Sequence, residues 1–450
     1  MATDRPAITA LAPRVRTGSL TASAMLDACL ARIRERDGAI NAFITVFEES
    51  AKTAALEADR EIAGGSYRGP LHGIPVSVKD LFDVAGVATT AASKVRKHHV
   101  AAKDSTIVRR LREAGAVIVG KTNLHEFALG TTNEDSAYGP VHHPLDLDRT
   151  PGGSSGGSGA AVADGMCVAS VGTDTGGSIR IPSALCGLVG LKPALGELPT
   201  DGLVPLSTTM DHAGPMCRSV DDAALLYQVL LGTANPAPLG PVGHALRLAV
   251  PRPYFLAALD ADVASVFERA CDALRAAQAT VADVAIPHAS EVPAVYTHIV
   301  LPEGAAYHAR TLDKRPGDYT TNVRLRLEMG RYIVAEDYVR ALKARRILAA
   351  EVDAALRDHD ALILPTVPIV APKLGVESVR VGSSTDTVRN ATLKCTQLFN
   401  ITGHPAITIP CGANGTGLPV GLQIVGARGN TRALLQVARA VEQTLAAVGA

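Results

Sequence analysis

The sequence predicts an α/β fold in which one large domain holds a central mixed, mainly parallel β-sheet covered by helices on both faces. Short apolar runs typical of strands alternate with stretches of helical periodicity as far as the last helix, as in βαβ units. No repeat of roughly 20–50 residues is visible, which excludes a solenoid or a propeller. No long low-complexity linker divides the chain, so the domain is predicted to span residues 1–450.

The expected elements follow from hydrophobic periodicity and from the residues that stop helices. A stripe through Met25, Cys29 and Ile33 predicts a first helix that ends at Asp37-Gly38, and a second helix spans 51–62. Strands are predicted at 74–78, 116–119, 168–171, 246–250, 281–286, 361–364, 406–409 and 422–425. The remaining helices are predicted at 105–114, 160–163, 263–277, 338–356 and 431–446, the last capped by Asn430.

Three parts are expected within the domain. Residues 1–65 form an N-terminal helical segment, residues 66–232 form a core that carries the motifs described below, and residues 244–450 complete the fold. The stretch 232–243 between the last two parts is rich in Pro and Gly and is the best candidate for an internal seam.

The composition excludes several classes of protein. Lys and Arg number 44 and Asp and Glu number 44, so the formal net charge is zero, which argues against a nucleic-acid binder with its basic excess. Hydrophobic residues make up 47% of the chain, which is enough for a large core and too much for global disorder. No apolar run reaches about 18 residues, so no membrane-spanning helix is expected.

The cysteines, histidines and first residues predict a cytoplasmic protein without a cofactor. The seven cysteines are scattered and form no C-x-x-C pair, which favours reduced, buried thiols. The thirteen histidines form no H-E-x-x-H, because His125-Glu126 lacks the second histidine, so no metal site is predicted. Residues 1–16 lack an uninterrupted apolar stretch, so no signal peptide is expected.

Glycine is concentrated in one stretch, 152–178, where nine of the 27 residues are Gly. Such loops bring backbone N–H groups and hydroxyls close to a ligand. A flexible linker is disfavoured because the stretch contains apolar runs at 160–163 and 168–171. A phosphate-binding loop is disfavoured because no Lys lies between Arg149 and Arg180.

Two serine hydrolase arrangements stay open for this stretch. The first is a nucleophile elbow, since 153–157 (GSSGG) fits G-x-S-x-G with Ser155 central, and Asp360 and His404 could complete it. What precedes it, however, is a Pro- and Asp-rich loop rather than the strand that an elbow requires. The second is a serine nucleophile in 175–178 (TGGS) with a base other than histidine, and Lys79 is the candidate because it follows an apolar strand. Burial lowers the pKa of a lysine and would fit it for this task.

The motifs then resemble those of the amidase signature family. The resemblance rests on 73–80 (GIPVSVKD), 152–158 (GGSSGGS) and 174–180 (DTGGSIR), in that order. It continues in 120–123 (GKTN), 127–130 (FALG), 187–193 (GLVGLKP), 403–406 (GHPA) and 417–423 (GLPVGLQ), and covers residues 5–445.

The resemblance implies an amidohydrolase with a Ser–cisSer–Lys triad. Carried over, Ser178 is the nucleophile that forms an acyl-enzyme, Ser154 is the bridging serine after a cis peptide bond, and Lys79 is the base. The oxyanion is expected to be held by the N–H groups of Thr175, Gly176, Gly177 and Ser178, with Ala128 lining the acyl pocket. Ser155, Asp174 and Arg180 are expected to support this loop.

The same motifs leave the substrate open. The first expectation is a small linear amide, with the region 295–345 shaping its pocket and no nucleic acid or membrane as partner. The alternative is the A subunit of the glutamyl-tRNA amidotransferase, which needs partner subunits and whose glutamine-holding arginine would lie near Arg340, Arg345 or Arg346. A third alternative is a non-catalytic relative that binds an amide or a protein. The sequence leaves a homodimer open.

Overall fold

One sheet of eleven strands spans the computed structural model, which describes residues 6–447. The strand order is β1-β3-β2-β4-β6-β5-β12-β13-β9-β7-β8. The strands are β1 (Phe43–Val46), β2 (Pro75–Lys79), β3 (Val117–Thr122), β4 (Ala169–Asp174), β5 (Val189–Lys192), β6 (His212–Cys217), β7 (Arg247–Val250), β8 (Thr280–Asp283), β9 (Ala361–Pro365), β12 (Ala406–Ala413) and β13 (Pro419–Val425). A separate hairpin pairs β10 (Ser378–Val381) with β11 (Ser384–Thr387). Residues 1–5, where the predicted N-terminal segment starts, and 448–450 lie outside the described residues.

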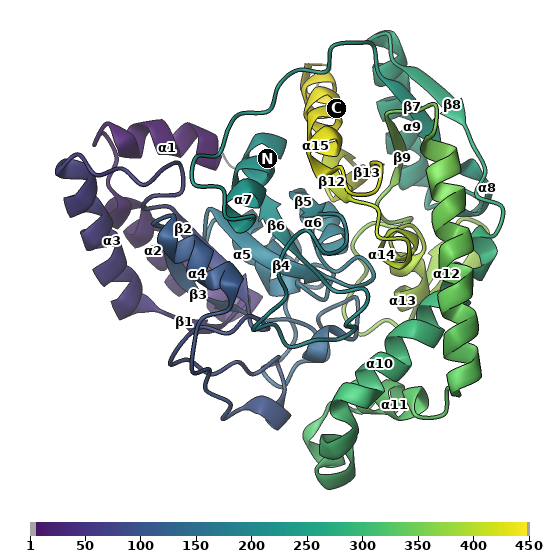
Figure 1. Ribbon diagram of the computed structural model, residues 1–450, viewed down its shortest axis with the longest axis horizontal. Helices are drawn as coiled ribbons and strands as arrows, with labels where there is room; N and C mark the ends of the chain where they lie inside the picture. The colour runs from purple at the N-terminus through teal and green to yellow at the C-terminus, as the bar shows by residue number, and fades with distance from the viewer. Residues whose placement is uncertain (1–5, 448–450) are drawn as a thin grey trace.

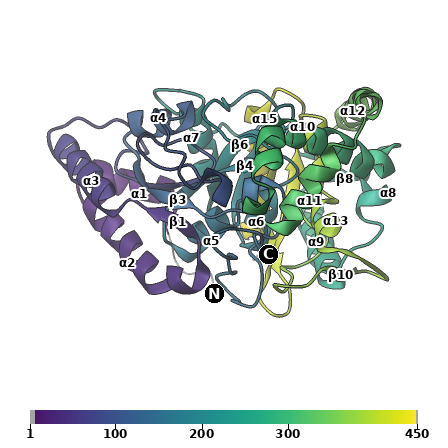
Figure 2. The ribbon, with the colours of Figure 1, turned by 90° about the horizontal axis from the view of Figure 1, so that it is seen from below.

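Parallel and antiparallel pairings occupy different parts of this sheet. The strands β3, β2 and β4 pair in parallel, and so do β9, β7 and β8 near the other end. Antiparallel pairings of β6, β5, β12 and β13 join the two parallel groups. The sheet therefore runs from the N-terminal helices, purple in Figures 1 and 2, to the green helices at the opposite end. The predicted mixed sheet with flanking helices is confirmed.

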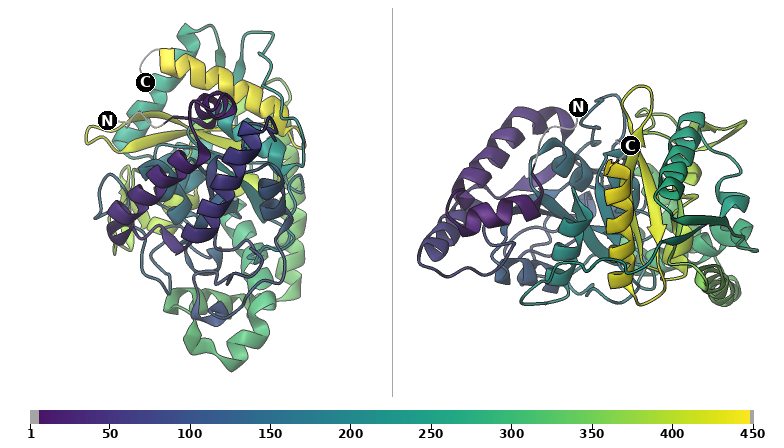
Figure 3. Two further views of the ribbon diagram at one scale, coloured as in Figure 1. Left: turned by 90° about the vertical axis from the view of Figure 1, so that its left-hand side faces the viewer. Right: turned by 90° about the horizontal axis from the view of Figure 1, so that it is seen from above.

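Helices cover both faces of the sheet, so successive strand residues, which point to opposite sides, are buried in different clusters. In β7, Leu248 and Val250 belong to one hydrophobic cluster and Ala249 to another. The first cluster is covered by α1 (Ile8–Arg16), α4 (Thr106–Glu113), α7 (Val220–Leu230), α9 (Ala261–Ala276) and α15 (Thr431–Ala447). Figure 3, seen from above, shows α15 lying along the C-terminal strands.

The other face carries the remaining helices. At the N-terminal end these are α2 (Ala22–Ile40), α3 (Glu48–Ala63) and α5 (Gly156–Asp164), which share a third cluster. The second cluster is covered by α6 (Arg180–Leu185), α10 (Val292–Lys314), α11 (Thr321–Gly330), α12 (Ala335–Leu356), α13 (Val388–Leu393) and α14 (Gln397–Ile401), with the short α8 (Arg252–Phe255) at its edge. Figure 1 shows α10–α12 together at the side opposite α1–α3.

Most predicted elements lie within a few residues of the observed ones, with three differences. The first helix continues through Gly38 to Ile40 and ends at Asn41, which has the left-handed conformation (φ 60°) that a helix end favours. The predicted end at Asp37-Gly38 was therefore wrong. The strand expected at 281–286 ends at Asp283. The elements that were not predicted are the strands β1, β5, β6, β10 and β11 and the helices α6, α7, α8, α10, α11, α13 and α14.

Two properties expected from composition can be compared with the structure. Within residues 6–447, all seven cysteines are buried and none forms a disulfide. No helix in this range is long and apolar enough to cross a bilayer.

Candidate active site

Lys79 is the last residue of β2 and points to the face of the sheet that α5 covers. Val76 and Val78 of the same strand belong to the cluster on the opposite face. Because side chains alternate along a strand, Ser77 and Lys79 face α5 instead. Both are fully buried, in a strand that lies between β3 and β4.

Three hydroxyl groups surround the amine of Lys79. Its Nζ lies 2.8 Å from Ser154 Oγ, 2.9 Å from Ser155 Oγ and 2.8 Å from Thr173 Oγ1. No carboxylate within the described residues forms an ion pair with it. A neutral amine has two N–H donors and one lone pair, so it can donate to two of these hydroxyls and accept from the third.

This environment favours the neutral amine. Burial lowers the pKa of Lys79 to about 7, although the charges of Asp174 and Asp211 act to raise it. A substantial fraction of the amine is then neutral near neutral pH, whereas an exposed lysine would be almost fully protonated. The group is therefore fitted to accept a proton.

Ser154 follows a cis peptide bond, as the resemblance implies. The bond joins Gly153 to Ser154, and the carbonyl oxygen of Ser154 accepts a hydrogen bond from the N–H of His125 at 3.1 Å. A Cβ on Gly153 would lie 2.9 Å from the backbone nitrogen of Asn133. The loop can therefore lie against this segment only with glycine at position 153.

The next residue, Ser155, links the loop to β4. Its hydroxyl donates to the carbonyl oxygen of Thr173 at 3.1 Å, and it lies 3.3 Å from the N–H of the same residue. The helix α5 begins directly afterwards, and its small side chains permit close packing. A Cβ on Gly157 would lie 2.4 Å from the carbonyl oxygen of Asn123. The glycines of this stretch therefore form a closely packed helix start rather than a flexible linker.

Ser178 lies in the turn that follows β4. Its side chain is almost fully buried, and its carbonyl oxygen accepts a hydrogen bond from the N–H of Ser155 at 3.2 Å. Within residues 6–447, no hydrogen bond joins the hydroxyls of Ser178 and Ser154. The turn is thus held beside the cis-peptide loop by the backbone, while the Ser178 hydroxyl is not tied to its neighbour.

The backbone of this turn presents donors that no other group uses. In the described part of the chain, no acceptor takes the N–H groups of Thr175, Gly176, Gly177 and Ser178. Convergent free N–H groups are what an oxyanion hole requires.

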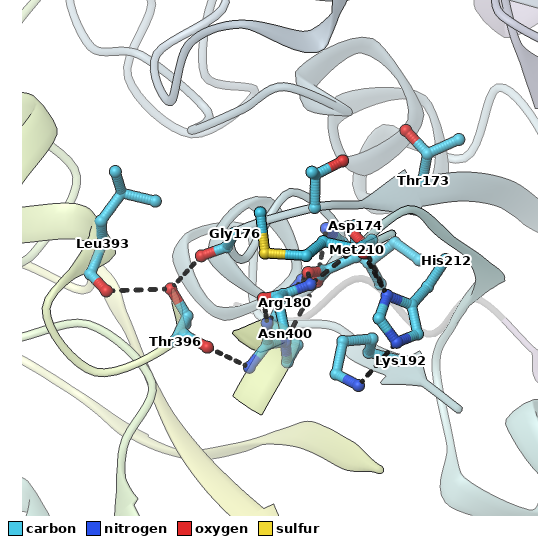
Figure 4. A network of polar contacts seen from close by, with 12 residues as sticks. Thr173, Asp174, Gly176, Arg180, Lys192, Met210, His212, Leu393, Thr396 and Asn400 are labelled. Carbon is cyan, nitrogen blue, oxygen red and sulfur yellow. Dashed lines mark hydrogen bonds and ion pairs between the residues drawn. The ribbon is translucent and has the colours of Figure 1, made fainter. Parts of the chain in front are cut away.

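The shape of the turn depends on its two glycines. Gly177 has a φ of 137°, a region that side chains with a Cβ avoid. A Cβ on Gly176 would lie 2.4 Å from the hydroxyl oxygen of Tyr296. Thr396, after α13, donates from Oγ1 to the Gly176 carbonyl oxygen at 2.6 Å, so that carbonyl is held on the side of α13 (Figure 4).

An ion pair between Asp174 and Arg180 supports the turn from behind (Figure 4). Arg180 donates from Nη2 to Oδ1 at 2.9 Å and from Nε to Oδ2 at 3.0 Å, and both residues are fully buried. The other N–H groups of Arg180 donate to Gln423, Asn400 and the carbonyl oxygen of Thr396. Burial alone would raise the pKa of Asp174, but Arg180 holds it well below its usual range.

Several residues of this network were not predicted as site residues. Thr173, which contacts the Lys79 amine, ends near Lys79 in the parallel neighbour strand β4, but strand alternation alone would place it on the face of Val171, so the register does not predict the contact. Asp211 accepts a hydrogen bond from Thr175 Oγ1 at 2.5 Å. Asn400, Gln423 and Thr396 come from the C-terminal part of the chain, where no local signal connects them to the turn.

Ala128 ends the 3₁₀ turn Glu126–Ala128, which directly follows His125, the residue that is hydrogen-bonded to the cis-peptide loop. It is buried, has a φ of 60°, and donates its N–H to the carbonyl oxygen of His125, whose own N–H contacts Ser154. The next carbonyl, that of Leu129, accepts a hydrogen bond from Arg326 Nη1 at 2.9 Å.

The nucleophile-elbow arrangement around Ser155 is not assembled. His404 lies 3.1 Å from Asp353 through Nε2, and Asp360 forms an ion pair with Arg247 at 2.9 Å. Neither contacts Ser155, whose hydroxyl is engaged by Lys79 and Thr173 instead.

Comparisons with known proteins show the family of this chain. The family model described as "Amidase" matches residues 24–435. The chain belongs to the amidase signature family. One relative, the A subunit of the glutamyl-tRNA(Gln) amidotransferase of Anaeromyxobacter sp. (strain K), is 38% identical over 96% of this chain and 94% of its own. Another, an amidase of Pseudomonas putida, is 40% identical over 91% of this chain and 89% of its own.

The fold of this amidase family member is also found in solved structures. A crystal structure of an amidase superposes with a TM-score of 0.93 at 40% identity, covering 97% of this chain and 99% of the other. The relatives thus include both a hydrolase and one component of a larger enzyme, and the family alone does not choose between them.

Proposed function

We propose that this chain is an amidohydrolase that cleaves the C–N bond of a small carboxylic amide to an acid and ammonia or an amine. In this proposal Ser178 is the nucleophile, Ser154 the bridging serine and Lys79 the base. The observation that carries it is the buried Lys79 amine, 2.8 Å from Ser154 Oγ and with only hydroxyl partners in the described residues. The family match and the relative named as an amidase support the same reaction class.

The proposed reaction moves one proton along the three residues. Neutral Lys79 takes a proton from the Ser154 hydroxyl, which takes one from Ser178 as the Ser178 oxygen bonds to the amide carbon. The carbonyl electron pair moves onto its oxygen, where the N–H groups of Thr175 to Ser178 stabilise the charge. The C–N bond then breaks, and the proton returns through Ser154 to the leaving nitrogen. Water attacks the resulting ester, with Lys79 again as the base, and releases the acid and free Ser178.

The supporting residues fit this proposal. Asp174 and Arg180 fix the end of β4 and the start of α6, so the turn between them holds its shape. Thr396 fixes the Gly176 carbonyl oxygen, so the Gly177 N–H, which belongs to the same trans peptide group, points the opposite way. A preorganised donor of this kind contributes a factor of about 10²–10³ to the rate.

The A subunit of an amidotransferase is the second candidate. The similarity to the Anaeromyxobacter protein favours it, because that relative is 38% identical over 96% of this chain. The same three residues would then release ammonia from glutamine, and partner subunits would use it. Ammonia release from glutamine only when partner subunits are added would favour this candidate over a free amidase.

A non-catalytic binding protein is the competing class, and one experiment separates it from both enzymes. The purified chain is incubated with a library of small primary amides and analysed by intact-mass and peptide mass spectrometry. An acyl adduct on the peptide that contains Ser178, absent from Ser178→Ala, is the expected result. Turnover that persists in folded Ser178→Ala would overturn the assignment of the nucleophile.

A further inference from the structure

A cavity of about 570 Å³ adjoins the candidate active site and is lined by two arginines, of which Arg389 has no partner in the described residues. Its walls come from two distant parts of the chain, and the residues used below are His125, Thr131, Asp135, Asn322, Arg326 and Arg389. We call it the arginine cavity.

The arginine cavity borders both sides of the site. On one side, the backbone of Thr131 packs on the cis-peptide loop, since a Cβ on Gly153 would lie 3.1 Å from the Thr131 carbonyl carbon. On the other side, α13 carries Arg389 and, one helical turn later, Leu393, which packs on the turn that carries Ser178. A Cβ on Gly176 would lie 3.1 Å from Leu393 Cδ2.

Arg389 has no partner for its charge. Its Nε is buried without a hydrogen bond, and in residues 6–447 its guanidinium forms neither a hydrogen bond nor an ion pair. Burial lowers the pKa of Arg389, and the group that acts against this is the phenol of Tyr296 rather than a carboxylate. The Arg389 side chain is half-buried, and a cation that loses part of its water without gaining a partner is typical of a binding site for an anion.

Arg326 adds a second positive charge to the same cavity. Burial lowers the pKa of Arg326 to about 10, and the positive charge of Arg389 acts in the same direction. Asp135 opposes this, but its carboxylate is already engaged, 3.2 Å from His125 Nε2 and 3.2 Å from Asn322 Nδ2. The two arginines therefore repel each other, and the carboxylate that acts on Arg326 already has two other partners.

The other acids of the cavity limit the charge of the ligand. Glu134 accepts a hydrogen bond from the Gly375 N–H at 2.5 Å, and Glu377 is exposed at the rim. Together with Asp135 they set three carboxylates against two arginines in the lining, which disfavours a dianionic phosphate, so the anion that fits the unpaired Arg389 is a single carboxylate. A guanidinium pairs with the planar carboxylate through two parallel hydrogen bonds.

We propose that Arg389 and Arg326 bind a carboxylate on the acyl part of the substrate, so that the preferred amide is the half-amide of a dicarboxylic acid. The acyl side follows from the expectation that Ala128 lines the acyl pocket, because Arg326 donates to the carbonyl oxygen of Leu129, next to Ala128. The proposal rests on the proposed amidase function for its reaction and on Arg389 for its specificity.

The first test compares turnover of charged and uncharged amides. The purified chain is assayed with succinamate, glutaramate and adipamate, and with uncharged alkyl amides of matched length. We expect kcat/KM to favour a half-amide, and Arg389→Met and Arg326→Met each to reduce that preference by at least about 30-fold, mainly through KM. Arg340→Met is the matched control, because Arg340 is exposed on α12 and pairs with Glu336, so its preference stays that of the wild type.

The second test measures binding without catalysis, by calorimetric titration of glutarate into Ser178→Ala with and without Arg389→Met. Binding that disappears with Arg389→Met supports the subsite, even if no amide is turned over and the amidase proposal fails. Turnover of uncharged amides with no preference for half-amides and no glutarate binding overturns the subsite and leaves the amidase proposal standing. If Arg389→Met does not fold, Arg389→Lys, which keeps the charge but loses the paired donors, serves in both tests.

Discussion

Two buried lysines on neighbouring strands have opposite partners. Lys79 ends β2 and contacts three hydroxyls, whereas Lys121 of β3, in register with Val78, lies 2.6 Å from the carboxylate of Asp80. Lys121 also donates to the carbonyl oxygen of Ala88 at 2.9 Å. Burial lowers the pKa of both amines, but only at Lys121 does a carboxylate in direct contact oppose it.

The difference teaches how one sheet can hold an amine suited to act as a base beside an amine held in an ion pair. A buried lysine with an ionised partner stays charged, and its value lies in the pair. A buried lysine with neutral hydroxyls gives up its proton near neutral pH and becomes a base. The partners decide the role, because the depth of burial is the same.

The largest expected effect separates the two lysines by activity. Lys79→Met replaces the proposed base with an uncharged side chain of similar volume at a fully buried position. We therefore expect amide turnover to fall by about 10³–10⁴-fold. The fold is expected to survive, because Lys79 forms no ion pair among the described residues and its replacement leaves no carboxylate there without a partner. Steady-state kinetics and circular dichroism measure both. A variant that keeps wild-type turnover would remove Lys79 from the mechanism.

The same substitution at the other lysine is expected to act on stability. Lys121→Met leaves the buried carboxylate of Asp80 unpaired, which costs about 3–5 kcal/mol of the free energy of unfolding. The double variant Lys121→Met/Asp80→Asn is expected to recover part of that loss. Denaturant unfolding provides the measurement, and a Lys121→Met protein as stable as the wild type would contradict the comparison.

The pH dependence of turnover is the next effect in size. Because the neutral amine is the active form and the pKa of Lys79 is about 7, kcat/KM should rise about tenfold per pH unit below that value and level off above it. Asp211 is a second group that titrates in this pH range, since burial raises its pKa to about 6. A profile that is flat between pH 5 and 9 would show that no group in this range controls the reaction.

The smallest expected effect concerns one of the three hydroxyls. Thr173→Val removes a contact with the Lys79 amine at nearly constant volume, so we expect kcat/KM to fall about tenfold. Thr173→Ser keeps the hydroxyl and should restore most of the activity. If the valine and serine variants behave alike, the Thr173 hydroxyl does not position the amine.

The sequence predicts the fold class and most strands near the motifs, because their periodicity and stop residues are local, but it misses β5 inside the motif 187–193. The motifs are also sufficient to place Lys79 and Ser154 in one predicted site, although 74 residues separate them in the chain. The end of the first helix was predicted too early because Gly38 is tolerated inside a helix that packing holds. The helix α10 was missed because it packs on three other helices and contains Pro302 and Gly304, which blur its periodicity.

The arginine cavity could not be predicted for a different reason. Arg389 lies in a short helix after an exposed hairpin, and nothing around it in sequence distinguishes it from a surface arginine. Arg389 stands out because its guanidinium has no hydrogen-bond or ion-pair partner in the described residues, and only a three-dimensional structure shows this. The amidotransferase alternative places its glutamine-holding arginine near Arg340, Arg345 or Arg346 of α12, where Arg340 is exposed and pairs with Glu336, whereas Arg345 donates to the Thr209 carbonyl oxygen.

The division of labour along the chain has an evolutionary consequence. The residues proposed for the chemistry fall between Lys79 and Arg180, whereas Tyr296, Arg326 and Arg389, around the arginine cavity, come from the C-terminal part. A lineage can therefore exchange or reshape its C-terminal helices and acquire a new substrate while inheriting an unchanged reaction.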